Sequence, residues 1–147
     1  MTDSMIQTPD EGPALLAAIQ AVNDSAKFNR WAGFQVLSAN AGEVELLMPW
    51  REEAGQYSGF LHAGLIGALI DTACGFAAST VAGRVMASHF SVNCLVPAVG
   101  QRFVARGRVV RAGRKQVFTH AELFAEEAIG GARKLVATGD AILVPVA

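Results

Sequence analysis

Charged residues are scarce in this sequence. They make up 17% of its 147 residues, whereas an average soluble domain carries about 25%. The net charge is -1, so the chain has no general electrostatic attraction for nucleic acid or for an anionic membrane surface. Hydrophobic residues reach 52%. We therefore expect self-association that buries apolar surface, and neither nucleic acid nor a membrane as partner.

Cysteine and histidine are also rare. The two cysteines, Cys74 and Cys94, lie inside apolar segments, which predicts buried, reduced thiols rather than a disulfide framework. The three histidines fall in different segments, and no cluster of His, Cys and carboxylate residues has the spacing of metal ligands. We expect no metal and no other cofactor.

Signal-peptide and membrane-spanning patterns are lacking as well. The first ten residues do not have the basic-then-apolar order of a signal peptide. The most apolar run, residues 65–79, is too short to cross a bilayer and contains Asp71. These features predict a cytoplasmic protein.

The order of predicted elements indicates one domain. Residues 1–11 predict a flexible tail, and residues 12–147 predict a single domain. Hydrophobic periodicity predicts a helix from Pro13, a long helix at about 62–82 that ends at Gly83, and strands at 34–39, 43–50, 86–96, 101–111, 116–125 and 134–144. This order predicts an α+β fold in which an antiparallel sheet packs against one central helix.

A single carboxylate, Asp71, stands in the middle of the long apolar helix. Asp71 follows His62 by nine residues, which is about 13 Å along a helix and roughly half a turn around it. The two side chains of one chain therefore cannot hold the same small group. If they share a site, Asp71 must meet the His62 end of a second chain, in a dimer with two equivalent sites.

The start of the same helix carries its own chemistry. Amides of residues 63–65 have no acceptor within the helix, and the helix dipole places partial positive charge there. Such amides can hold an oxyanion that develops on an attacked carbonyl, while a carboxylate activates water or attacks directly. Together these parts predict acyl transfer to water.

Simpler interpretations of the same residues stay open. Asp71 could be a structural acid bonded to backbone or to Thr72, and His62 could be an ordinary N-cap. The glycines at 64, 67 and 75 could serve close helix packing.

The segments Gln56…His62-Ala63-Gly64…Asp71 and Asn93-Cys-Leu-Val-Pro97-Ala98 resemble the PaaI-like (phenylacetyl-CoA thioesterase-like) acyl-CoA thioesterases of the hotdog fold. The likeness covers roughly residues 30–145. It implies a sheet wrapped around the long helix and an acyl-CoA substrate that is hydrolysed to free acid and coenzyme A. It also implies homodimers with a continuous sheet and shared active sites, often paired into tetramers.

Carried over by position, the resemblance assigns Asp71 as the catalytic carboxylate, acting as general base or nucleophile. The backbone N–H of Ala63 would polarise the thioester carbonyl, and Gln56 would lie beside the thioester or position the water. His62 would orient the loop and the carbonyl. Gly64, beside them, would contact substrate.

Three positions depart from the family pattern. Ala63 stands where Gly is usual, which keeps the amide but would make a positive φ costly. Cys94 replaces a usual Tyr, and Ala87 falls where some members carry a Ser or Thr that helps to hold water. Ser88 and Ser91 are near, but strand alternation places Ser88 on the face opposite Ala87. These departures bear on rate and substrate range.

Half of the twelve basic residues lie within fourteen positions: Arg102, Arg106, Arg108, Arg111, Arg114 and Lys115. Most are expected to form a solvated strand face. A sharper hypothesis places Arg111, Arg114 and Lys115, around the turn at Gly113, on the phosphates of coenzyme A. No aromatic residues interleave with these charges, which disfavours nucleic-acid binding.

Two other functions stay open from the sequence. A hotdog dehydratase or hydratase would need a His and a carboxylate paired in one site. A non-catalytic acyl-CoA-binding module would keep the pocket without needing Asp71. The sequence does not choose the acyl group, the pathway, dimer or tetramer, or the exact role of Asp71.

Overall fold

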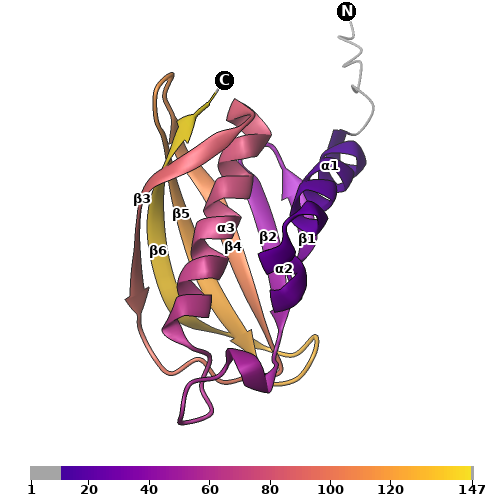
Figure 1. The fold of residues 1–147 in the computed structure, drawn as a ribbon, viewed down its shortest axis with the longest axis vertical. Helices are drawn as coiled ribbons and strands as arrows, with labels where there is room; N and C mark the ends of the chain where they lie inside the picture. The colour runs from indigo at the N-terminus through magenta and orange to yellow at the C-terminus, as the bar shows by residue number, and fades with distance from the viewer. Residues whose placement is uncertain (1–10, 147) are drawn as a thin grey trace, which may run out of the picture.

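An antiparallel sheet of six strands curves around one long helix in the computed structural model, which describes residues 11–146 (Figure 1). The strands lie in the order β1-β2-β4-β5-β6-β3. The helices are α1 (Glu11–Ser25), α2 (Lys27–Ala32) and α3 (Ala63–Ala82), with a 3-10 turn η1 at Glu52–Ala54, and the strands are β1 (Gln35–Asn40), β2 (Glu43–Pro49), β3 (Val85–Cys94), β4 (Arg102–Ala112), β5 (Val117–Glu126) and β6 (Arg133–Pro145).

This architecture confirms the predicted α+β class with a sheet around one central helix. The long helix and the six strands begin and end within about two residues of their predicted limits. Residues 1–10 of the predicted tail lie outside the described residues, and Glu11 already begins α1. Helix α2 was not predicted, because its six residues are too few for a periodic apolar pattern.

The central helix α3 lies close to the sheet because two strands present glycine to it. A Cβ at Gly107 of β4 would lie 2.4 Å from the carbonyl oxygen of Ala73, and one at Gly139 of β6 would lie 2.7 Å from Cγ2 of Ile70. Any larger residue would force the helix away. Ala73 and Ile70 are fully buried as a result, which leaves Asp71 on the side of α3 that faces away from the sheet.

By length and apolar composition alone, α3 could cross a membrane, with a mean hydropathy of 1.6. The run at 65–79 was expected to be too short, but the helix that contains it extends to 20 residues. Half of the apolar window is buried inside the fold, as in the core helix of a globular protein.

Strand β3 forms an open edge of the sheet and is exposed over most of its length. Met86 is 66% exposed and Phe90 is 47% exposed. The Leu95 N–H donates to the Val136 oxygen at 2.9 Å, and antiparallel alternation from that pair directs the backbone groups of Phe90 and Val92 away from β6. An apolar edge with free backbone groups is a surface on which a second strand can pair.

Candidate active site

Two cavities lie along α3, one at its start and one beside its middle and second half. The first, which we call the start cavity, has a volume of about 480 Å³ and is lined by the loop before α3 and the segment after β3, including Gln56, His62, Ala63 and Cys94. The second, the Asp71 cavity, has a volume of about 620 Å³ and lies among α3, α1 and the beginning of β3. Both volumes fall in the range of about 300–1,000 Å³ that is typical of small-molecule sites.

His62 is the N-cap of α3. Its backbone is extended (φ -61°, ψ 137°), and its Nδ1 accepts a hydrogen bond from the Gly64 N–H at 2.8 Å. A nitrogen that accepts carries no proton, so the proton of the neutral ring lies on Nε2. The His62 N–H donates to the Ala54 oxygen at 2.9 Å and ties the helix start to η1. The capping interpretation of His62 is therefore correct, and it leaves Nε2–H available to a ligand.

The first turn of α3 offers one free amide. The N–H groups of Leu65 and Ile66 donate to the His62 oxygen, and that of Gly64 donates to His62 Nδ1. The N–H of Ala63 makes no hydrogen bond within residues 11–146. Of the three amides expected to hold an oxyanion, only Ala63 is thus available, with the positive end of the helix dipole behind it.

Alanine at position 63 carries no backbone strain. Among the described residues only glycines have a positive φ, so Ala63 adopts the ordinary backbone of a first helical residue. The substitution of the family's usual Gly therefore leaves the amide in place at no conformational cost.

Gln56 stands at the base of a tight turn. Its N–H donates to the Phe60 oxygen at 2.8 Å, and its carbonyl accepts from the Gly59 N–H at 3.1 Å. Its side-chain oxygen accepts from the Ser58 N–H. Gly59 has a φ of 77°, which glycine adopts without penalty. Because the amide oxygen is engaged, the side-chain NH₂ is the part of Gln56 that can reach a ligand in the start cavity.

Asp71 is a half-buried acid without a partner. Its carboxylate makes no hydrogen bond or ion pair in the described part of the chain, so the structural bond to Thr72 or to backbone is not formed. Burial raises the pKa of the Asp71 carboxyl above its ordinary value of 3.8. An ionisable group that is desolvated in a cavity and lacks a structural partner is a candidate for chemistry.

The predicted site residues fall into two groups that one chain does not bring together. Gln56, His62 and Ala63 line the start cavity, whereas Asp71 lines the other. No three His, Cys, Asp or Glu side chains converge anywhere in residues 11–146 in a way that could hold a metal. A site with all four residues needs a second copy of the chain.

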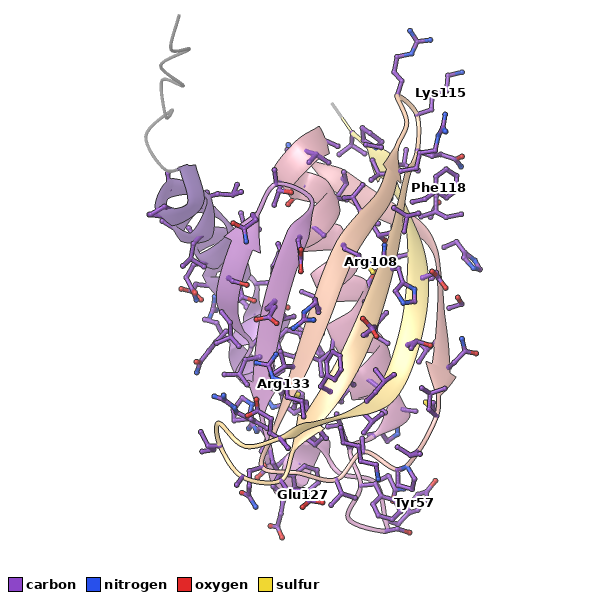
Figure 2. All side chains as sticks on the ribbon, turned by 180° about the vertical axis from the view of Figure 1, so that it is seen from behind. Tyr57, Arg108, Lys115, Phe118, Glu127 and Arg133 are labelled. Atoms are coloured by element: carbon purple, nitrogen blue, oxygen red, sulfur yellow. The ribbon has the colours of Figure 1, made fainter. Side chains whose placement is uncertain are left out.

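The basic residues of β4 and its following turn divide into two sets. Arg102 and Arg106 form ion pairs with Glu126 and Glu45. In contrast Arg108, Arg111, Arg114 and Lys115 are exposed and make no ion pair within the described residues. Figure 2 shows Lys115 at the end of the sheet opposite Tyr57, which neighbours Gln56. The phosphate hypothesis therefore cannot apply to the start cavity of the same chain.

The departures at positions 87 and 94 alter the two cavities. Ala87 places only a methyl group in the wall of the Asp71 cavity. Ser88 does not replace a water-holding hydroxyl there, because it is the bulged residue and donates to the Ile142 oxygen at 3.3 Å. Cys74 is buried as expected, but the same expectation is wrong for Cys94, which is exposed at the start cavity because β3 is an uncovered edge.

Three contributors to the Asp71 cavity were not predicted from the sequence. Helix α1 supplies one wall, Gly75 supplies an open position on α3, and Arg84 stands at the rim. The only signal of this cavity in the sequence was the spacing of Asp71 and Gly75. They are four residues apart, which places both on one side of the helix.

The chain matches the family described as Thioesterase superfamily over residues 58–132. A protein of Halobacterium salinarum that is provisionally named an esterase is 34% identical over 105 residues, which are 66% of this chain and 69% of the relative. The crystal structure of a thioesterase family protein from Silicibacter pomeroyi superposes with a TM-score of 0.83 at 32% identity, covering 88% of this chain and 96% of that one.

The E. coli PaaI protein from the phenylacetic acid degradation operon has the same fold. Its structure superposes with a TM-score of 0.75 at 18% identity and covers 90% of this chain and 96% of its own. The predicted hotdog fold, a sheet wrapped around one long helix, is thereby confirmed.

Proposed function

The chain belongs to the thioesterase superfamily, and from this premise we propose that it hydrolyses acyl-CoA thioesters in a two-fold dimer with two shared active sites. One observation carries the proposal. The free Ala63 amide and the unpartnered Asp71 carboxylate line different cavities of the same chain, so each is half of a site. Antiparallel pairing of two α3 helices brings each Asp71 to the partner's Ala63.

The open edge at β3 supports this assembly. Pairing of β3 with the partner's β3 would satisfy the free backbone groups of Phe90 and Val92 and cover apolar side chains that are exposed in one chain. The result is one continuous twelve-stranded sheet, twice the six strands of one chain. A pair of such dimers is the tetrameric alternative.

In the proposed mechanism the substrate carbonyl lies at the start of α3. Its oxygen accepts a hydrogen bond from the Ala63 N–H, which strengthens as negative charge develops on that oxygen. Gln56 and His62 hold the thioester through the side-chain NH₂ and Nε2–H. Both groups are free of acceptors in the described chain.

The partner's Asp71 then takes a proton from water, and the resulting hydroxide adds to the carbonyl carbon. The tetrahedral intermediate collapses with cleavage of the carbon–sulfur bond, and the leaving thiolate of coenzyme A recovers the proton. The raised pKa of Asp71 makes it a stronger base than an exposed aspartate. Direct attack by Asp71 would form an anhydride instead, and single-turnover hydrolysis in isotopically labelled water distinguishes the two, since only attack puts label into Asp71.

The exposed turn with Arg111, Arg114 and Lys115 is the proposed phosphate contact. Figure 2 shows Lys115 of this turn at the end of the sheet opposite Tyr57 of the same chain. In the proposed two-fold dimer, this end would lie beside the start of the partner's α3. Three unpaired cations there suit the phosphates of coenzyme A. The reduced thiols fit the cytoplasm as the proposed location.

Two single variants remove the two halves of the site. Asp71→Asn removes the base and is expected to lower kcat by about 100- to 10,000-fold. Ala63→Pro removes only the amide proton, because proline is favoured at the first helical position and His62 already has the extended backbone that must precede it. It is expected to lower kcat by about 100- to 1,000-fold, while Ala63→Gly, the matched control, keeps the amide and the activity.

Mixing the two variants tests whether sites are shared. After denaturation and refolding together, half of the dimers pair one Asp71→Asn chain with one Ala63→Pro chain, and each such dimer has one intact site. The mixture is expected to recover about one quarter of the parental activity. No recovery would show that each site lies within one chain. A folded parent that binds acyl-CoA without hydrolysing it would instead favour the binding module.

A further inference from the structure

The Asp71 cavity is a groove that crosses α3. Helical spacing places Asp71, Gly75, Ser79 and Thr72 one after another around the side of α3 that faces away from the sheet, and all four line the cavity. The opposite wall is α1, which contributes Leu15, Ala18, Ile19 and Val22. The groove therefore leads from the carboxylate over the helix to an apolar wall.

Gly75 is the point at which the groove passes over α3. It follows Asp71 by four residues, which places both on one side of the helix. A Cβ added at Gly75 would meet no atom within 4 Å, in contrast to Gly107 and Gly139, where it would strike the helix or a strand. Within the described chain, glycine at position 75 is therefore required for no contact with another element, and what it leaves is space beside the carboxylate.

The wall on α1 is apolar and runs from the core to exposed side chains, because Ile19 belongs to the core and Leu15 packs against it. Val22 is 56% exposed, whereas Ile19, on the same helix, is buried at 6%. The exposed Val22 lines the groove together with Leu15 and Ala18. Apolar side chains that face an open groove next to a reactive group suit an apolar part of the substrate.

We propose that this groove binds the linear acyl chain of the substrate and that Gly75 sets the length it accepts. The inference rests on the proposed thioesterase function and names its substrate class. Because a helix with its side chains is about 10 Å across, a chain that leaves Asp71, crosses Gly75 and reaches α1 is on the order of eight carbons long. Shorter acyl groups stop at Asp71 and do not use the groove.

The test compares chain-length profiles. In the parent, octanoyl-CoA and dodecanoyl-CoA are expected to be hydrolysed with higher kcat/KM than butanoyl-CoA. The leucine side chain in Gly75→Leu fills the groove where it passes over α3. Each methylene of the acyl chain that is thereby excluded from the groove lowers kcat/KM about fourfold. We expect a loss on the order of 100-fold for octanoyl-CoA, mainly in KM, with butanoyl-CoA changed less than about threefold.

Neighbouring residues of α1 provide a matched control. Ala17 and Ala18 are both exposed, but only Ala18 lines the groove. Ala18→Asp is expected to lower activity on octanoyl-CoA selectively, and Ala17→Asp is expected to change no substrate. Equal losses on all chain lengths, or equal effects of the two aspartates, would overturn the proposal.

Two further results separate this inference from its premise. If the parent hydrolyses acyl-CoA but Gly75→Leu keeps the parental profile, the groove is not the acyl site although the thioesterase proposal stands. If Gly75→Ala dissociates the dimer in sedimentation, the glycine serves helix packing across the interface and the inference is wrong. A parent inactive on every acyl-CoA overturns the proposed function as well.

Discussion

In the proposed mechanism Asp71 is the catalytic base, although burial disfavours the ionised form of its carboxyl. It sits on an otherwise apolar helix with no hydrogen-bond partner in the described chain, and burial raises the pKa of its carboxyl. A structural acid would be expected to have such a partner. The cost of an unpaired carboxylate is therefore best explained by function, since a desolvated base takes a proton from water more readily.

The proposed role of Asp71 makes activity depend on pH. Only the ionised form of Asp71 can act as base, so kcat/KM should fall as pH decreases through a pKa that lies above 3.8. The measurement is a pH–rate profile with octanoyl-CoA or any accepted substrate. In the Asp71→Asn variant the residual activity should lack this acidic limb. An acidic limb that survives in the variant would assign the titration to another group.

The raised pKa of Asp71 also affects the stability of the fold, and this effect is unfavourable. An acid whose pKa is raised by folding binds its proton more tightly in the folded state, so ionisation destabilises the fold as pH rises past 3.8. Above the raised pKa the full cost is present. Asp71→Asn should therefore raise Tm at neutral pH and leave it unchanged at acid pH, where the parent is protonated.

At the scale of elements, the buried carboxylate of Glu126 joins β4, β5 and the turn between β5 and β6. Glu126, at the end of β5, is 1% exposed and pairs with Arg102 of β4. It also accepts from Arg133 Nε at 3.0 Å and from the Gly130 N–H at 3.2 Å, which ties in the β5–β6 turn. The hydrogen bond from Arg102 is the main cause that lowers the pKa of Glu126 to about 2.

This cluster predicts the acid sensitivity of the fold. Because the pKa of Glu126 falls from 4.5 to about 2 on folding, its stabilisation is complete above pH 4.5 and is lost as pH falls from there toward 2. The loss is on the order of 3 kcal/mol. Denaturant unfolding across this range should show it. Glu126→Gln should remove the dependence and destabilise the protein at neutral pH by about 3–5 kcal/mol.

The adjacent residue supplies the control for Glu126. Glu127 is exposed at the rim of the sheet (Figure 2) and forms no ion pair within the described residues. Glu127→Gln should therefore leave the pH dependence of unfolding at its parental form. Equal effects of the two substitutions would mean that net charge, and not the buried cluster, governs acid unfolding.

At the scale of the whole molecule, the open edge at β3 is the surface through which we propose that two chains pair. A single chain exposes an apolar strand beside its central helix and keeps its two candidate half-sites apart. Pairing through this edge would correct both conditions at once, since it buries the strand and joins the half-sites.

Proline at two adjacent positions of β3 tests this edge. Val92→Pro removes an N–H that points to the open edge, whereas Ser91→Pro removes one that belongs to the ladder with β6. Val92→Pro should yield a folded monomer without activity in sedimentation and thioesterase assays. Ser91→Pro should lower Tm sharply. An active monomer of either variant would contradict the shared site.

Local pattern was enough to predict the long helix, the six strands and the division of the site. The alternation at 43–50 and the long apolar run that ends at Gly83 gave limits that the structure reproduces, because strand and helix periods are properties of neighbouring residues. The nine-residue separation of His62 and Asp71 likewise predicted that they do not meet within one chain. The catalytic roles of these residues remain predictions that the variants above test.

Which polar groups are free depends on packing between elements that are distant in the chain. The sequence does not distinguish the amides of Ala63 and Gly64 as oxyanion donors. In the structure the Gly64 N–H donates to His62 Nδ1, and the Ala63 N–H remains free. Gly75 and Gly107 are both glycines, yet one opens a groove and the other admits a helix backbone. Sequence period sets which way a residue faces along its own element. Which atoms the side chain contacts on that side depends on how elements that are distant in the chain pack together.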